Sequence, residues 1–352
     1  MFEGCAINQN KRIIEIEYLR GFAILAVLAI HTSSNFIHIQ NLNLLLITNV
    51  IIDVFAHFAV PLCIFISGFV LPIKYDSSMS KRSFYKKRVL SIIPPYIIFS
   101  IVYICIRTIG HWKMNGVLEY PSLTNILFWI LTASSAFHMW FFALVIQFYM
   151  IYPYIIHLYE KYSLKKQLIL LLLITFLVQE SWLVSRDVLQ TYSNPTINLL
   201  LTSVFLSHIF YFILGIYTYH NYENMKKNVL ENKKLLSFFV LLFTIVISIF
   251  WIKGIIEYGN YSSIPAYFFI IPDLIGTVYY PLIFLLLLIS AINLESSNRI
   301  LSNIFLSLGN YSFGIYLIHA IYMNIIINVL FPKVNIDVDQ SIYYILLFLL
   351  TL

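Results

Sequence analysis

Two side chains in one apolar stretch near the start of the chain, Arg20 and His31, are the first candidates for chemistry. If the stretch is a single α-helix, the two residues lie about 16 Å apart along its axis. Two interpretations remain open. In the first, the arginine reaches lipid headgroups and the histidine bonds a neighbouring carbonyl group. In the second, the arginine binds an anion on the cytosolic side of a membrane, and the imidazole is a titratable base towards the other side.

A second pair, Asp53 and His57, has i, i+4 spacing, so a helix would place both side chains on one face. A carboxylate in that position can orient an imidazole by accepting its ring proton. The same spacing fits a structural pair equally well. Pro61 follows, where we expect the helix to bend, and Ser67-Gly68 then predicts close helix packing.

A cluster of basic residues lies before the third apolar stretch. Its members are Lys81, Arg82, Lys86, Lys87 and Arg88. One interpretation is a topology determinant that binds anionic lipid headgroups, and the other is a site that captures a phosphorylated cytosolic ligand. Pro94-Pro95 follows, and we expect this pair to interrupt the helix inside the membrane.

Two further groups of polar or aromatic residues fall in apolar surroundings. Trp140 lies near the expected outer face, where an aromatic belt explains it as well as a sugar-stacking surface does. His319 lies within a late apolar stretch, after Gly309 and Gly314, which suit tight helix contacts. A single histidine in such a place is more often structural than catalytic.

Other kinds of site leave no trace in the sequence. It has no metal-ligand spacing, P-loop, GxSxG motif or nucleic-acid-binding signature. We therefore predict no metal site, no bound cofactor and no nucleic-acid partner.

The elements that carry these residues are expected to be membrane-spanning helices. Charged residues make up 11% of the chain, 60% is apolar or aromatic, and the mean hydropathy is +0.84. A soluble domain carries about 25% charged residues, so a polar shell cannot be built here. The apolar runs are continuous rather than alternating, which favours helices over a barrel.

Ten spans are expected, with a further apolar stretch at 124–136 that is too short to cross and is re-entrant or interfacial. The spans are 16–36, 45–73, 89–110, 139–159, 167–184, 197–219, 235–252, 264–292, 304–331 and 341–352.

The distribution of basic residues orients these spans. With the N-terminus in the cytoplasm, the only Lys and Arg residues left outside are Arg107, Lys113, Arg186, Lys253 and Lys333. We therefore predict an all-α, polytopic membrane protein of about ten transmembrane helices, with a cytoplasmic N-terminus. Residues 1–352 are expected to form one transmembrane domain in the cell (plasma) membrane, and the chain is expected to stop inside its last helix.

Six motifs, in order, resemble those of the membrane-bound acyltransferase-3 family, from about residue 12 to the end. They are YLRGFAILAVLAIH, VPLCIFISGFVLP, FYKKRVLSIIPPY, HMWFFALVIQFY, FYFILGIYTY and LGNYSFGIYLIH. Within the family, the chain is most similar to the IcaC-like proteins of staphylococcal poly-N-acetylglucosamine operons, notably in FYFILGIYTYHNYE.

The resemblance implies transfer of an acyl group, commonly acetyl or succinyl, from cytosolic acyl-coenzyme A to a carbohydrate hydroxyl at the outer face. The family's Arg-x10-His motif falls on Arg20 and His31. His31 would be the general base or an acyl relay, and Arg20 would bind the donor or orient the pore. The acidic residue usually found three positions before the arginine is Asp, and here it is Glu17.

A donor site is implied at the basic cluster, where the family's Arg-x-x-Arg motif falls on Arg88 and Ser91. The second arginine is therefore missing. Lys87, one turn before Ser91, is the expected replacement, although it is a point charge rather than a planar fork, and Lys86 lies beside it. The residues expected to support the site are Glu17, Asp53, His57, Trp140 and His319.

The expected partners are acyl-coenzyme A as donor substrate, a polysaccharide or glycan acceptor, membrane lipids and glycan synthases. Two other functions remain open. The missing arginine favours a component that exports the glycan, a role also proposed for IcaC-like proteins. A membrane scaffold without chemistry would require Arg20 and His31 to be incidental.

Overall fold

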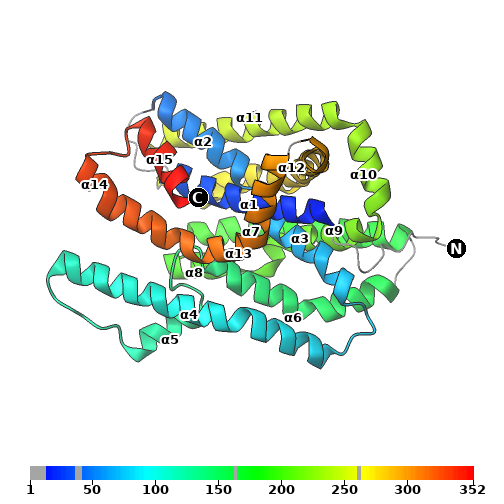
Figure 1. Ribbon diagram of the computed structural model, residues 1–352, viewed down its shortest axis with the longest axis horizontal. Coiled ribbons are helices and arrows are strands. Elements are labelled where there is room, and N and C mark those ends of the chain that lie inside the picture. Colours follow the sequence, from blue (N-terminus) through cyan, green and yellow to red (C-terminus); the bar gives the residue numbers. More distant parts are fainter. Residues whose placement is uncertain (1–12, 36–41, 162–164, 260–262, 298) are drawn as a thin grey trace. The chain divides into compact units, whose positions relative to one another are not determined.

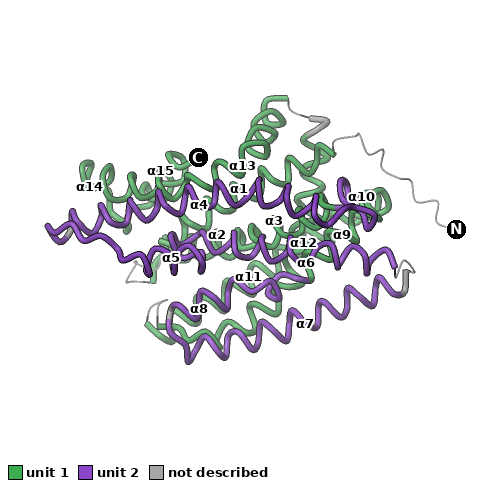
Figure 2. The backbone as a smooth tube through the Cα atoms, turned by 90° about the horizontal axis from the view of Figure 1, so that it is seen from below, with its two compact units in different colours: residues 1–71, 210–352 green, residues 72–209 purple. Residues whose placement is uncertain are grey.

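The computed structural model describes residues 13–35, 42–161, 165–259, 263–297 and 299–352 (Figure 1). All regular structure in these residues is helical, which confirms the all-α prediction. The chain divides into two compact units, and each is described by itself. Unit 1 holds residues 1–71 and 210–352, and unit 2 holds residues 72–209 (Figure 2).

The helices of unit 1 come from both ends of the chain. They are α1 (Ile14–Ser33), α2 (Leu44–Ala56), α3 (Ala59–Lys74, which continues past the boundary), α9 (Ile209–His220), α10 (Tyr222–Glu231), α11 (Lys233–Tyr258), the 3-10 turn η4 (Ala266–Phe269), α12 (Ile270–Ser297), α13 (Arg299–Ile325), the π-helical turn η5 (Ile326–Leu330), α14 (Phe331–Val334) and α15 (Ser341–Thr351).

The helices of unit 2 are continuous in sequence. They are α4 (Lys81–Asn115), α5 (Leu123–Leu131), α6 (Trp140–Lys161), α7 (Lys165–Thr191), α8 (Pro195–Thr202) and the 3-10 turn η2 (Phe205–His208). Side-chain caps begin three of them: Ser80 at α4, Ser122 at α5 and Asn194 at α8 each accept a hydrogen bond from the backbone N–H three residues later.

Seven helices in the described residues are long and apolar enough to cross a membrane. They are Leu44–Lys74, Lys81–Lys113, Trp140–Lys161, Gln167–Thr191, Lys233–Tyr258, Ala266–Leu294 and Arg299–Val334. An eighth results if Thr196–Thr202 and Phe205–His220, which meet at 45°, form one bent span.

These helices agree with eight of the ten spans predicted from the sequence. The first predicted span, 16–36, forms α1, which is not among the seven, and its last residue lies outside the described part. The final one, 341–352, forms α15, a shorter apolar helix of 11 residues. The apolar stretch 124–136 contains only the nine-residue helix α5. Ten spans and a cytoplasmic N-terminus therefore stay predictions.

Two proline sites that were predicted to disturb their helices differ in outcome. In unit 1 the helix is broken between α2 and α3, at His57 and Phe58. Pro61 has no N–H for the carbonyl of His57 four residues earlier, which accounts for the break. In unit 2 the expected interruption at Pro94-Pro95 is wrong, because α4 runs through both residues. Proline's fixed φ is itself helical, so only two backbone hydrogen bonds are lost there.

Glycines let α1 approach α13 closely, and α13 is the main neighbour of α1. A Cβ atom on Gly21 would lie 2.7 Å from the carbonyl oxygen of Phe305, and one on Gly309 would lie 2.0 Å from that of Glu17. The other glycine expected to make a tight contact, Gly314, has open space around it, so that prediction is wrong. The predicted close packing at Gly68 is present, against the backbone of Phe212.

Candidate active site

The packing of α1 on α13 brings His31 and His319 together within unit 1. Gly21 and Gly309 set the contact, and each histidine follows its glycine by ten residues. Because each histidine lies on the C-terminal side of its glycine and the two histidines meet, α1 and α13 run parallel. The two imidazole rings are stacked, with centroids 5.2 Å apart and an interplanar angle of 17°. The structure thus joins two of the predicted site residues from opposite ends of the chain.

The backbone fixes the proton position on His319. Its Nδ1 lies 2.7 Å from the carbonyl oxygen of Tyr316, which can only accept, so Nδ1 carries a proton, and in the neutral form of the ring the lone pair is on Nε2. The residue is fully buried, whereas His31 is half-buried. The stack therefore pairs a buried imidazole with a more accessible one.

A second set of side chains begins two residues after His31. Ser33 donates from its Oγ to Oδ1 of Asp53 over 3.1 Å, and Oδ2 of the same carboxylate lies 3.2 Å from Nδ1 of His57. The predicted pairing of Asp53 with His57 is therefore present as geometry. Asp53 is buried. A carboxylate can be buried in an apolar helix at low cost here because partners contact both of its oxygens.

Arg20, in the N-terminal half of α1, is held by the carboxylate of Glu17. Its Nη1 lies 3.1 Å from Oε1 and 3.0 Å from Oε2, one helical turn away. The Glu17 that replaces the family's Asp therefore reaches the arginine. The carboxylate of Glu17 compensates the charge of the Arg20 guanidinium. Arg20 is therefore better suited to orienting α1 than to binding a second anion.

Two more contacts fix the beginning of α1. The hydroxyl groups of Tyr18 and Ser302 lie 2.7 Å apart, and Lys226 Nζ of α10 donates to Glu15 Oε1 over 2.5 Å. Burial raises the pKa of Glu15, but the hydrogen bond and charge of Lys226 outweigh it, so the pKa lies below its ordinary value.

Arg88 lies in an aromatic cage in unit 2. The centre of its guanidinium is 4.9 Å from the ring of Tyr75, 5.1 Å from that of Tyr149 and 5.6 Å from that of Phe84. The hydroxyl of Tyr152 donates to the carbonyl of Tyr75, which holds that wall of the cage. Within the described residues Arg88 makes no ion pair, and its buried Nε has no hydrogen-bond partner.

The neighbours of Arg88 differ from it in exposure. Lys86 and Lys87 are exposed, and Nζ of Lys87 lies 5.8 Å from the Tyr75 ring centre. Ser91, which stands where the family has its second arginine, is also exposed and donates from its Oγ to the carbonyl of Arg88. The predicted donor site thus holds one caged cation and two exposed point charges.

Trp140, predicted as a supporting residue, is the first residue of α6 in unit 2, where its ring makes an edge contact with Phe141 at a centroid distance of 6.5 Å.

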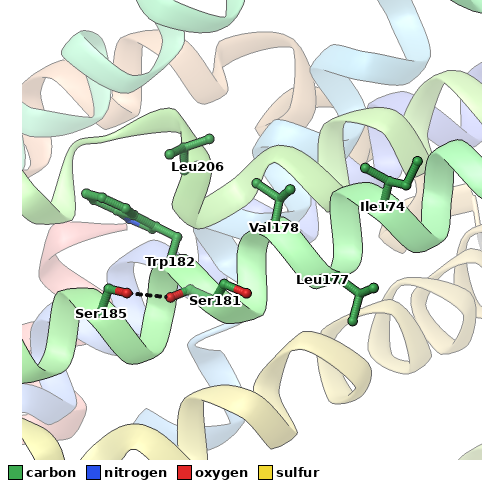
Figure 3. Close-up of a pocket in the computed structure, with 7 residues that line it drawn as sticks. All are labelled: Ile174, Leu177, Val178, Ser181, Trp182, Ser185 and Leu206. Atoms are coloured by element: carbon green, nitrogen blue, oxygen red, sulfur yellow. Dashed lines mark hydrogen bonds between the residues drawn. The ribbon is translucent and has the colours of Figure 1, made fainter.

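A separate groove of about 440 Å³ lies along α7 of the same unit. It is lined by Ile174, Leu177, Val178, Ser181, Trp182, Ser185 and Leu206 (Figure 3). None of the predicted site residues lines it.

Several contributors to these clusters were not expected from the sequence. They include Ser33, the cage residues Tyr75, Phe84 and Tyr149, and Trp251, whose ring contacts His57. Ser33 had a signal, because it follows His31 by two residues in a polar TSSN run that ends an apolar helix. Tyr149 and Trp251 had none, because 26 tyrosines and 29 phenylalanines make single aromatic residues uninformative.

In the described part of the chain, no group of three or more His, Cys, Asp or Glu side chains is arranged to hold a metal ion.

Comparison with known proteins gives one match. Residues 13–352 match the family model of the acyltransferase-3 family, described as an acyltransferase domain. Neither the curated proteins nor the solved structures contain a match.

Proposed function

The chain belongs to the acyltransferase-3 family, and on that premise we propose that it moves an acyl group across a membrane boundary. The donor is cytosolic acyl-coenzyme A carrying an acetyl or succinyl group. The acceptor is a hydroxyl of an extracytoplasmic polysaccharide, as in the IcaC-like branch, and the cell membrane is the site of action.

The observation that carries this proposal is the stack of His31 on His319 in a helix that also bears Arg20. A sugar hydroxyl is a poor nucleophile, and an imidazole positioned to remove its proton accelerates attack by roughly 10²–10⁴-fold. Membrane helices contain few ionisable groups, and two stacked imidazoles in one place need a reason beyond packing.

The reaction follows from these groups. His31 accepts the proton of the acceptor hydroxyl as its oxygen attacks the thioester carbonyl carbon. The carbon–sulfur bond then breaks, and the thiolate of coenzyme A leaves and takes that proton from His31. No other reactant is required, and His31 returns to its starting state.

Arg88 is the proposed anchor for the donor. Coenzyme A carries phosphate groups, and the caged guanidinium offers an uncompensated charge with a buried N–H that lacks a partner in the described residues. Lys86 and Lys87 add exposed positive charge beside it. The aromatic rings hold Arg88 in place without neutralising it, so one arginine can serve where the family has two.

The orientation of the helices supports the proposed topology. Membrane spans that run parallel are separated by an odd number of other spans. Between α1 and α13 that number is seven only if α8 and α9 together count as one bent span and α5 does not cross. We propose that α1 and α15 complete ten spans, with the N-terminus, Arg20 and the Arg88 cluster on the cytoplasmic side.

The direct test is reconstitution of the protein in vesicles with ¹⁴C-acetyl-coenzyme A, or its succinyl counterpart, and an N-acetylglucosamine oligosaccharide. Wild type is expected to label the oligosaccharide, and His31→Ala is expected to lose at least a hundredfold in rate. His111→Ala, an exposed histidine in α4, is the matched control and is expected to keep the wild-type rate.

An export role is the second candidate, favoured by the break between α8 and η2. Transporters often bind their substrates at broken membrane helices. If the vesicles move the glycan across the bilayer while no label reaches it, the export role replaces the acyltransferase role.

A further inference from the structure

The reaction described above leaves the Asp53–His57 pair without a task, although its position is unusual. His57 lies at the break between α2 and α3, inside the membrane helix Leu44–Lys74. Its side chain is 38% exposed, whereas that of Asp53 is 3% exposed. A polar ring exposed at such depth costs free energy unless it faces water or a polar ligand.

The contacts of His57 settle which ring nitrogen meets such a ligand. Nδ1 lies 2.7 Å from the carbonyl oxygen of Asp53 and 3.2 Å from its Oδ2. Both atoms are acceptors, so Nδ1 carries a proton, and in the neutral form of the ring the lone pair is on Nε2. Within the described residues every polar contact of His57 runs through Nδ1. Nε2 is therefore an oriented acceptor for an incoming hydroxyl.

An aromatic surface lies next to that acceptor. The indole ring of Trp251, from α11, makes an edge contact with the His57 ring, with centroids 5.6 Å apart. Trp251 is itself held by the ring of Phe269, 5.1 Å away. Sugar rings present hydroxyls at their edge and apolar C–H groups on their faces, which matches a hydrogen-bond acceptor beside an indole.

The same network reaches the proposed base. Ser33, which donates to Oδ1 of Asp53, is two residues from His31 on α1. The carboxylate therefore fixes the His57 ring on one side and contacts the end of the helix that carries His31 on the other. A ligand on His57 would thus be held at a fixed position relative to His31.

We propose that His57, oriented by Asp53, and Trp251 form the acceptor subsite. A hydroxyl of the acceptor sugar donates to Nε2 of His57, and the C–H face of the ring packs on the indole of Trp251. His57 and Trp251 bind the sugar, and Asp53 is a positioning residue. The subsite rests on the proposed function for its place in a reaction but is defined by binding alone.

The test measures binding of a fluorescent N-acetylglucosamine pentasaccharide to the full chain in lipid nanodiscs, without donor. His57→Leu and Trp251→Leu are each expected to weaken binding about tenfold, as loss of one good contact does. Trp112→Leu, an exposed tryptophan in α4, is the control and is expected to bind like wild type.

Two milder variants separate binding from misfolding. Asp53→Asn keeps the shape of the side chain but removes the carboxylate charge that orients the ring. The backbone carbonyl of residue 53 still accepts from Nδ1, so Nε2 stays the acceptor and binding is expected to fall less than in His57→Leu. Trp251→Phe retains an aromatic face and is expected to keep most of the wild-type affinity.

The outcomes separate the two proposals. If His57→Leu and Trp251→Leu bind like wild type, or wild type does not bind, the subsite is overturned, and label transfer that depends on His31 still supports the acyltransferase. If binding depends on His57 and Trp251 while no label is ever transferred, the subsite stands and the acyltransferase proposal fails.

Discussion

Arg20 in unit 1 lies about one hydrogen-bond length from both oxygens of Glu17, whereas Arg88 in unit 2 lies among the rings of Tyr75, Phe84 and Tyr149. A carboxylate neutralises a guanidinium, and aromatic faces hold it without removing its charge. The charge of Arg20 is thus compensated inside the chain, whereas the charge of Arg88 is left for an anion outside it.

On the proposed function, the two arginines have different roles. Arg20 would help to arrange α1, and Arg88 would contribute binding energy for a phosphorylated donor. This contrast would also explain how Ser91 is tolerated, because a cage that orients one arginine lowers the need for a second.

The largest effect is expected at the cage. Arg88→Gln removes the uncompensated charge, so the KM for acyl-coenzyme A should rise about a hundredfold, as expected when a hydrogen bond to a charged group is lost. Steady-state rates at varied donor concentration measure it. Arg82→Gln, an exposed arginine in the same helix, should change KM little. Equal effects of the two substitutions would mean that the cage confers nothing beyond general positive charge.

A smaller effect is expected from the helix contact that supports unit 1. Gly309→Ala places a methyl group against the carbonyl of Glu17, and we expect a loss of about 2 kcal/mol in the free energy of unfolding, as for other overpacked sites. Denaturant unfolding in detergent measures this loss.

Gly314→Ala, in the same helix, provides the matched control. Its new methyl group meets open space, so the gain in helix propensity should stabilise the protein by up to about 1 kcal/mol. If both substitutions destabilise the protein equally, the close approach of α13 to Glu17 is not what holds α1.

The smallest effect is expected at the Glu15–Lys226 pair, through its dependence on pH. The pKa of Glu15 is lowered in the folded state, so the pair stabilises the protein fully above the ordinary glutamate pKa and loses this effect as pH falls through the lowered value. Lys226→Met should therefore cost about 0.5–1 kcal/mol at neutral pH.

Unfolding temperatures measured from pH 7 down to pH 3 test this sign. The curves of wild type and Lys226→Met should converge at the acid end of that range. Curves that stay parallel throughout would show that Lys226 acts through packing of its hydrocarbon stem rather than through charge.

Local spacing predicted much of what lies within a single helix. The i, i+4 interval of Asp53 and His57 was enough to expect their contact, and the apolar runs gave the long helices. Pro94-Pro95 failed as a predictor of a break because proline removes backbone donors but keeps a helical φ. The helix breaks before Pro61 but continues through Pro94-Pro95, and the sequence around each proline does not distinguish the two cases.

Contacts between helices could not be read from spacing. The stacking of His31 on His319 depends on the register that Gly21 and Gly309 impose, and nothing near either histidine states that register. Gly314 carried the same sequence signal as Gly309 and makes no such contact. The cage around Arg88 likewise assembles rings from three segments, which a chain rich in aromatic residues does not single out.

The partnership of α1 with α13 also has a consequence in time. Tyr18 and its partner Ser302 are 284 residues apart, so a ribosome adding about 5–20 residues per second needs roughly a quarter of a minute to a minute to produce the second after the first. During that interval the nascent first helix, with Glu17 and Arg20, lacks its main neighbour. The two histidines can meet only after α13 has been synthesised.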